Sequence, residues 1–323
     1  MRCGIIVRMA KHLLHLGFLL AVGALALKAA FMPPRMQAPL KPGESAMLED
    51  GVVVLKGFEV PKYKDGKPRQ YVSDVHVISG TASEGCKPEA THARISVNHP
   101  LRWKGWWLYQ SSYDAACESY TVIEAVRDPF LPAAALAGIF LLAGSAMMCR
   151  GCSFRGGGLR QTGGRQCGPA AAIAGFARFA AAAAVVMLPL WIAGRVLLAK
   201  ELVPALQSPL LVPHVGAYLA SYAILIFAAF GIGRRFVPFG FFLMTLALVL
   251  GALWGKICWG DWWQYDPKEM WSLATWLTFA AYFHFRGNAA AEKWILRIGS
   301  VMIILTLTWV NFSKFFKGLH SYV

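Results

Sequence analysis

Two kinds of side chain in this sequence could do chemistry: imidazoles at the ends of long apolar segments, and a dense group of indoles. Among the eight histidines, His214 opens one apolar segment and His320 follows the last one, while His15 and His284 lie near the opposite ends of two others. Neutral imidazole is a common axial ligand of haem iron. We therefore consider one outer and one inner pair of metal ligands. A lone interfacial histidine is more often structural, and His12 competes with His15.

The densest aromatic stretch, 254–271, holds five tryptophans and one tyrosine in 18 residues. An aromatic belt at a membrane surface is the alternative explanation, but a belt needs fewer rings. Flat indoles suit a flat apolar ligand, and their N–H groups can bind carboxylates. A porphyrin with its two propionates fits that description. We therefore expect a haem platform formed by Trp254, Trp259, Trp262, Trp263, Tyr265, Asp266 and Trp271.

The end of this aromatic stretch also has the signals of a helix start. Asp266 suits the N-cap, Pro267 the first helical position, and Glu269 the third position of a capping box. These carboxylates are expected to position the loop rather than to act in catalysis. His284 lies about 27 Å further along such a helix, so it cannot share a site with the aromatic loop.

Long apolar runs must position these residues. The chain of 323 residues is 57% hydrophobic, and its mean hydropathy is +0.47. About 20 apolar residues span a bilayer core, and seven runs come near that length. They predict a membrane all-α helical bundle of about seven transmembrane helices, the first of which could alternatively be a cleavable signal peptide. The runs are 12–31, 130–149, 171–198, 211–232, 236–254, 270–285 and 294–312.

The net charge of +15 indicates membrane topology rather than nucleic-acid binding. Residues 32–128 contain 12 basic and 12 acidic side chains, so the whole excess lies in the membrane part. There it gathers in alternate short loops, such as 150–165 and Arg234–Arg235. Basic loops face the cytoplasm. We expect a multi-pass protein of a bacterial inner membrane, with the N-terminus cytoplasmic, residues 32–128 and the C-terminus periplasmic, and no nucleic-acid partner.

The segment between the first two apolar runs has the pattern of β-strands. Alternating or β-branched runs occur at 51–55, 71–78 and 93–97, and an aromatic run at 106–110. We therefore expect a small β-rich periplasmic domain over 32–128, inserted between helices at 1–31 and 129–149. A cytoplasmic basic loop at 150–170 and a five-helix domain at 171–323, with the aromatic loop at 254–271, complete the expected organisation.

Cysteines add two open alternatives. Cys86 and Cys117 fall in the periplasmic segment, where a disulfide is permitted. Cys149 and Cys152 form a C-x-x-C that could be a redox or metal pair, although two reduced loop thiols are the simpler interpretation. Ser153 follows them, so they are not a c-type haem attachment site, which requires histidine there.

The C-terminal half resembles a known family. Its stretch Trp259-Gly-Asp-Trp-Trp-Gln-Tyr-Asp-Pro-Lys-Glu-Met-Trp-Ser-Leu-Ala-Thr-Trp276 is similar to the tryptophan-rich haem-handling signature of the CcsA/ResC proteins of System II cytochrome c biogenesis, with Tyr265 where tryptophan is usual. The segments 203–214 and 317–322 resemble those that carry the family's two outer haem ligands. Ala281-Tyr-Phe-His284 resembles the segment with its transmembrane histidine.

The N-terminal half resembles the other System II component, ResB/CcsB. The resemblance rests on Ile95-Ser-Val-Asn-His-Pro-Leu-Arg-Trp-Lys-Gly-Trp-Trp-Leu-Tyr-Gln-Ser-Ser-Tyr-Asp114 and on Tyr71-Val-Ser-Asp-Val75 before it. Leu14-His-Leu-Gly-Phe18 resembles the ResB helix with the partner transmembrane histidine, which favours His15 over His12 and retention of the first helix. His99 is interpreted as a structural turn residue.

The two resemblances together imply a CcsBA-type fusion. Haem b would enter near His15 and His284, move outward, and be held by His214 and His320. The aromatic loop would present it to the Cys-x-x-Cys-His thiols of an apocytochrome c. The implied activity is that of a cytochrome c haem lyase, a thioether-forming synthase. The implied partners are apocytochrome c, haem, membrane lipid and a periplasmic thioredoxin-like thiol reductant.

Two other functions stay open from the sequence. The chain could be a haem-binding handover subunit that needs a partner for ligation. It could also be a non-haem membrane transporter or scaffold in which the aromatic loop is only an interfacial belt. Loss of haem, or of cytochrome maturation, after mutation of His214 or His320 separates the first two functions from the third.

Overall fold

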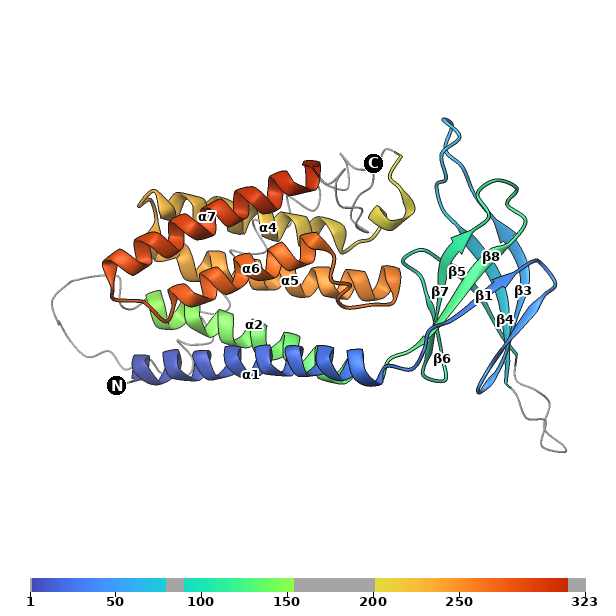
Figure 1. Cartoon of the computed structure of the whole chain (residues 1–323), viewed down its shortest axis with the longest axis horizontal. Coiled ribbons are helices and arrows are strands. Elements are labelled where there is room, and N and C mark those ends of the chain that lie inside the picture. Colours follow the sequence, from blue (N-terminus) through green and yellow to red (C-terminus); the bar gives the residue numbers. More distant parts are fainter. Residues whose placement is uncertain (1, 80–89, 154–200, 313–323) are drawn as a thin grey trace.

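The computed structural model describes residues 2–79, 90–153 and 201–312, and it consists of a helical bundle with a β-region at one end (Figure 1). The helices over 211–229 and 237–259 contain apolar residues on almost every face, as expected for segments that cross a membrane. The helices are α1 (Arg2–Phe31), α2 (Leu131–Ser153), α4 (Leu211–Ala229), α5 (Val237–Trp259), α6 (Pro267–Tyr282) and α7 (Ala289–Phe312), with short 3₁₀ turns at Pro204–Leu206 and Arg234–Phe236.

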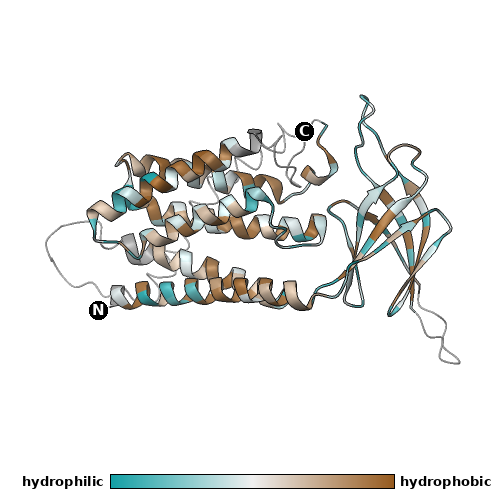
Figure 2. Ribbon diagram, viewed as in Figure 1, coloured by the Kyte–Doolittle hydropathy of each residue, from teal (hydrophilic) through white to brown (hydrophobic). Residues whose placement is uncertain are grey.

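Four of the described helices are long and apolar enough to cross a membrane: Gly4–Phe31, Leu131–Cys149, Leu211–Ala229 and Arg234–Trp259. The expectation of about seven spans is therefore not confirmed. The expected run 171–198 lies outside the described residues. Helix α6 has only 16 residues, about 24 Å of helix, which is shorter than the hydrocarbon core of about 30 Å. Figure 2 shows hydrophobic residues along much of the length of the long helices.

Helices α1 and α2 pack closely because glycines face the opposing backbone. A Cβ on Gly17 would lie 2.9 Å from the Leu141 nitrogen, and one on Gly144 would lie 2.9 Å from the Leu14 nitrogen. Small residues at such crossings let membrane helices approach. The bundle core beside this pair includes Phe241 and other fully buried apolar side chains, among them Leu225, Met244, Phe279, Leu296 and Ile303.

The β-region consists of two four-stranded antiparallel sheets, as the strand patterns predicted in part. One has the order β1-β8-β7-β6 and the other β2-β3-β4-β5. Alternate side chains such as Val53, Leu55, Val75 and Val77 are buried, which is the period of a half-buried strand. The strands are β1 (Met36–Leu40), β2 (Ser45–Leu48), β3 (Gly51–Glu59), β4 (Val72–Ser79), β5 (Ala90–Ser96), β6 (Leu101–Trp103), β7 (Trp106–Tyr113) and β8 (Thr121–Arg127).

The two ends of the bundle differ. The sheets, the turn 260–266 and the C-terminal end of α7 lie at one end, which we call the sheet end (Figure 1). The N-terminus of α1 and the turns 230–236 and 283–288 lie at the other, which we call the basic end because Arg234, Arg235 and Arg286 are there. Candidate residues near these ends therefore belong to two separate regions of the bundle.

Candidate functional site

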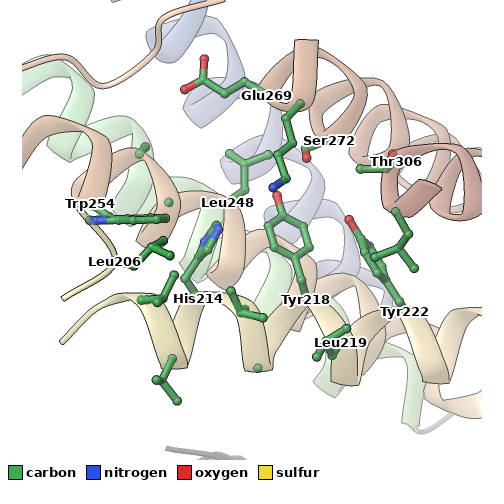
Figure 3. A pocket seen from close by; sticks show the side chains of 18 of the residues that line it. Leu206, His214, Tyr218, Leu219, Tyr222, Leu248, Trp254, Glu269, Ser272 and Thr306 are labelled. Carbon is green, nitrogen blue, oxygen red and sulfur yellow. The ribbon is translucent and has the colours of Figure 1, made fainter. Parts of the chain in front are cut away.

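One face of α4 carries three rings in a row. His214, Tyr218 and Tyr222 are four residues apart, so they lie above one another on the helix. The centroids of His214 and Tyr218 are 5.2 Å apart, and those of Tyr218 and Tyr222 are 5.3 Å apart. All three line a cavity of about 560 Å³ between α4, α5, α6 and α7 (Figure 3). That volume is within the range of ordinary ligand sites.

The neighbouring helix fixes the orientation of the His214 imidazole. Its Nδ1 lies 2.8 Å from the carbonyl oxygen of Ala247. A carbonyl only accepts, so Nδ1 carries the proton and Nε2 carries the lone pair that a metal needs. Gly251 makes room for the ring, because a Cβ there would lie 2.5 Å from His214 Cε1.

The indoles expected to form a platform divide into two groups. Trp254, Trp262 and Trp263 line the same cavity as His214, and the centroids of His214 and Trp254 are 5.9 Å apart. Trp259 packs beside Trp254, with ring centroids 5.4 Å apart and planes tilted at 42°. It packs there against a small buried cluster that includes Leu211 and Cys258.

The remaining predicted platform residues are not among the described residues that line the cavity. Tyr265 is 59% exposed and has a φ of +57°. Trp271 is half-buried on α6. The Asp266 carboxylate accepts a hydrogen bond from the Lys268 nitrogen at 2.8 Å, and Glu269 completes the capping box. The expected helix start is therefore confirmed.

The cavity has polar groups at the end formed by α6 and α7. Lys268, Glu269 and Ser272 line it from α6, and Thr306 lines it from α7. The Ser272 side chain lines the cavity beside the two α4 tyrosines, and Figure 3 shows the hydroxyls of these three residues gathered in one region. An ammonium with several hydroxyls suits a carboxylate-bearing ligand.

The two inner histidines meet at the basic end of the bundle. The rings of His15, on α1, and His284, in the turn after α6, have centroids 5.3 Å apart and planes at 70°. The His15 Nδ1 lies 2.6 Å from the Lys11 carbonyl oxygen, which again leaves Nε2 as the nitrogen with the lone pair. The structure thus brings together two residues that are 269 positions apart.

The outer pair is seen only in part, because His320 lies outside the described residues, as do Cys86 and residues 154–170 of the expected loop. Residues 150–153, which were expected to begin that loop, form the end of α2. The sequence reasoning also missed Tyr218 and Tyr222 as cavity residues. Their signal was present: with His214 they repeat every four residues within an apolar helix, which places them on one face.

The side chains at these sites have the chemistry that a haem ligand requires. The described residues contain no group of three or more His, Cys, Asp or Glu placed to hold a bare metal ion. A porphyrin supplies four of the ligands itself, so imidazoles suffice as axial ligands. The cavity adds flat indole walls and, at one end, a cation and hydroxyls for propionates.

Comparisons with known proteins match two separate parts of the chain. Residues 8–126 match the model of the ResB-like family, and residues 231–321 match that of the cytochrome C assembly protein family. The first match covers most of α1 and the sheets. The second match covers the aromatic loop and the helices on both sides of it.

Relatives named "Cytochrome c biogenesis protein CcsA" match part of the chain. That of Guillardia theta is 41% identical over 92 residues, 27% of this chain and 30% of the relative. That of Prochlorococcus marinus (strain MIT 9312) is 31% identical over 182 residues, which are 39% of this chain and 57% of the relative. That of Chlamydomonas reinhardtii is 31% identical over 153 residues, which are 38% of this chain and 43% of the relative. The chain thus spans between about a third and somewhat over half of these relatives.

The two family models match two separate parts of one membrane protein, residues 8–126 and 231–321, and the relatives support a role in cytochrome c biogenesis. The chain is a fusion of a ResB-like segment with a CcsA-type cytochrome c assembly segment, the two components of System II.

Proposed function

We propose that this protein carries haem b from the inner histidines to the outer cavity and there attaches it covalently to the Cys-x-x-Cys-His motif of an apocytochrome c. The observation that carries the proposal is the cavity at the sheet end, where an imidazole of fixed tautomer shares a wall with three indoles. A flat, apolar, iron-containing ligand is the substrate that uses all of these features.

The proposed route has two haem-binding positions, which we call the inner and the outer station. His15 and His284 form the inner station, at the basic end. His214, with His320 as its proposed partner on the opposite face of the porphyrin, forms the outer one. Trp254, on the cavity wall, would support the ring beside the iron. A pair of imidazoles at each station would bind both axial positions of the haem iron.

Attachment needs no nucleophile from this chain. Each cysteine S–H adds across one vinyl C=C bond: sulfur bonds to the inner carbon, and hydrogen ends on the outer carbon. The addition is redox-neutral. Holding haem and both thiols together supplies catalysis by proximity. Lys268, at the polar end of the cavity, would pair with a propionate and set which edge of the porphyrin faces the apocytochrome.

The proposed orientation follows from charge. Arginines cluster in the turns at the basic end, and basic loops face the cytoplasm. The sheets and the cavity would then lie on the periplasmic side of a bacterial inner membrane. Free thiols oxidise in that compartment. A periplasmic thioredoxin-like reductant is therefore a proposed partner, which would keep the apocytochrome cysteines ready to react.

Co-expression with a c-type apocytochrome in a host that lacks its own maturation genes tests the proposal. We expect covalent haem on the apocytochrome with the native chain, and strong loss with His214→Ala. His92→Ala is the control, because His92 is exposed on β5 and its imidazole contacts Asp74 and His76 within the sheet. Equal cytochrome yields from the two variants would rule out the outer site.

The same experiment separates a lyase from a handover subunit. A lyase yields haem that stays on the apocytochrome through denaturing electrophoresis. A handover subunit yields a His214-dependent Soret band on the purified chain and no covalent product until a partner is supplied. Absence of any His214-dependent Soret band would instead favour a transporter or scaffold without haem.

A further inference from the structure

A buried ionic contact joins the ResB-like part to the aromatic loop; by this part we mean α1 and the β-region up to Asp128, two residues beyond the end of the 8–126 match. Lys256, near the end of α5, extends Nζ to Oδ2 of Asp128, which lies just before α2, at 2.8 Å; their side chains are 2% and 0% exposed. The same carboxylate oxygen accepts the indole N–H of Trp262 at 3.1 Å. Trp262 lines the cavity beside His214. One oxygen from the ResB-like part therefore contacts both the α5 end and the cavity wall.

The backbone between Lys256 and Trp262 is fixed from the same side. Lys256 Nζ also donates to the Gly260 carbonyl at 3.1 Å, and the Tyr109 hydroxyl of β7 donates to the Lys256 carbonyl at 2.9 Å. Gly260 has a φ of +78°, and a Cβ there would lie 3.1 Å from the Tyr109 ring. The position of the first turn of the aromatic loop is thus set by the sheets.

A second, more exposed contact lies alongside. Asp261 accepts hydrogen bonds from Lys28, at the end of α1, and from Arg35 at 2.7 Å. Arg35 also bonds Glu124 of β8 at 2.9 Å. The Arg35 side chain is 32% exposed, so solvent screens this contact more than the buried one. The orientation of Trp262 therefore depends chiefly on Asp128.

We propose that Asp128 of the ResB-like part is a positioning residue for the haem cavity: with Lys256 as its counter-ion, it holds the Trp262 indole in the wall beside His214. This inference rests on the proposed function for its haem readout. It explains what a ResB-like segment adds to a CcsA-type cavity, since the carboxylate that orients a wall of the cavity comes from outside the cytochrome c assembly match.

The charge state of Asp128 agrees with this role. Burial by itself raises the pKa of the carboxyl group, but the hydrogen bond and charge of Lys256 outweigh burial and hold the pKa below its ordinary value. An ionised carboxylate only accepts hydrogen bonds. The Trp262 N–H therefore has a permanent acceptor, and charge-assisted bonds of this kind are the stronger ones.

Two double variants of the full chain in detergent isolate the Trp262 contact. Asp128→Leu with Lys256→Met replaces the buried ion pair by apolar groups, a change that proteins often tolerate, and removes the acceptor. Asp128→Asn with Lys256→Met removes the same charges but keeps an amide oxygen. We expect the first to bind haem about tenfold more weakly, equal to about 1.4 kcal/mol, and the second to bind nearly as the native chain does.

A haem-free readout accompanies the titration. The Trp262 indole N–H signal in a proton–nitrogen NMR spectrum, assigned by its loss in Trp262→Phe, is expected to move upfield in the leucine double variant and much less in the asparagine one. Trp263→Phe is the matched control, because Trp263 lines the cavity without a bond to Asp128. It is expected to leave the Trp262 signal and its response unchanged.

The results discriminate clearly. Identical indole shifts and identical haem affinities in the two double variants would overturn the inference. So would an affinity difference that persists when both are combined with Trp262→Phe. If the native chain binds no haem but the Trp262 signal still follows the acceptor at position 128, the proposed function fails while the positioning by Asp128 stands.

Discussion

At the scale of the residue, the cavity depends on how closely small groups fit around His214. Its ring is held between a carbonyl on α5 and the space above Gly251, where a Cβ would lie 2.5 Å from Cε1. The sequence predicted that His214 and several indoles would share a site, and His214, Trp254, Trp262 and Trp263 do line one cavity. Haem binding by these residues stays a prediction. Tyr218 and Tyr222 were open to the same reasoning, because their spacing alone places them on the His214 face.

Gly251→Ala should therefore displace the His214 imidazole and weaken haem binding by at least about tenfold. A Soret titration of the purified chain measures this. The control is Gly138→Ala on α2, where a Cβ would meet Val249 at an ordinary 3.5 Å. Each variant replaces a helical glycine by alanine, so the gain in helix propensity is the same in both. A Gly251 variant that binds haem as tightly as the Gly138 variant would mean that the His214 ring position does not limit binding.

The buried pair between Asp128 and Lys256 predicts a pH dependence of stability. Burial by itself would raise the pKa of Asp128, but the hydrogen bond and charge of Lys256 lower it by more, so the pKa in the folded chain lies below the ordinary carboxyl value. A depressed carboxyl pKa stabilises the fold above the unfolded pKa, and this contribution is lost as the pH falls through the folded value.

Melting temperatures of the native chain and of the double variant Asp128→Asn, Lys256→Met test this linkage between pH 7 and pH 3. Their difference should be constant down to about pH 5 and shrink below about pH 4, because the Asp128 carboxyl of the unfolded chain takes up a proton there while that of the folded chain stays ionised to a lower pH. A difference in melting temperature that stays the same from pH 7 to pH 3 would show that ionisation of Asp128 does not contribute to stability.

At the scale of the element, apolar length predicted the helices more reliably than it predicted which ones span the membrane. Helices α6 and α7 are present, but their share of charged residues and the 16-residue length of α6 exclude them from the four clear spans. Strand positions such as 93–97 were visible in their alternation. The division into two sheets was not, because pairing such as β1 with β8 joins residues about 90 positions apart.

The crossing of α1 and α2 is a feature of this scale, and it positions His15 against His284. Gly144→Ala would place a methyl group 2.8 Å from Leu14 Cγ and 2.9 Å from the Ala10 carbonyl oxygen. Overpacking of this kind costs about 1–3 kcal/mol. We expect a lower melting temperature and weaker haem retention at the inner station.

Gly23→Ala is the control for this crossing, because it lies in α1 and a Cβ there meets nothing within 4 Å. Exchange of glycine for alanine in an open helix position stabilises by up to about 1 kcal/mol. Melting curves of the two variants should therefore move in opposite directions. If both move upward together, α1 and α2 do not cross as closely as the structure shows.

At the scale of the whole molecule, the contact between the two parts could not be predicted from the sequence. Lys256 in an apolar helix was detectable as a costly charge, but its partner lies 128 positions away and only the packing of α5 against the sheets brings them together. Membrane topology, by contrast, can be predicted from the charges of the loops. The positive-inside rule predicts that the basic end lies in the cytoplasm and the sheet end in the periplasm.

Single cysteines placed on a chain with its natural cysteines changed to serine test this orientation. Met47→Cys lies at the sheet end on β2, where Met47 is 79% exposed, and Ile232→Cys lies in the turn at the basic end, where Ile232 is 61% exposed. In right-side-out spheroplasts, a membrane-impermeant maleimide should label position 47 at once and position 232 only after permeabilisation, because the arginines of that turn stay inside. The reverse order of labelling would place the haem cavity on the cytoplasmic side, where thioether formation on a periplasmic cytochrome could not take place.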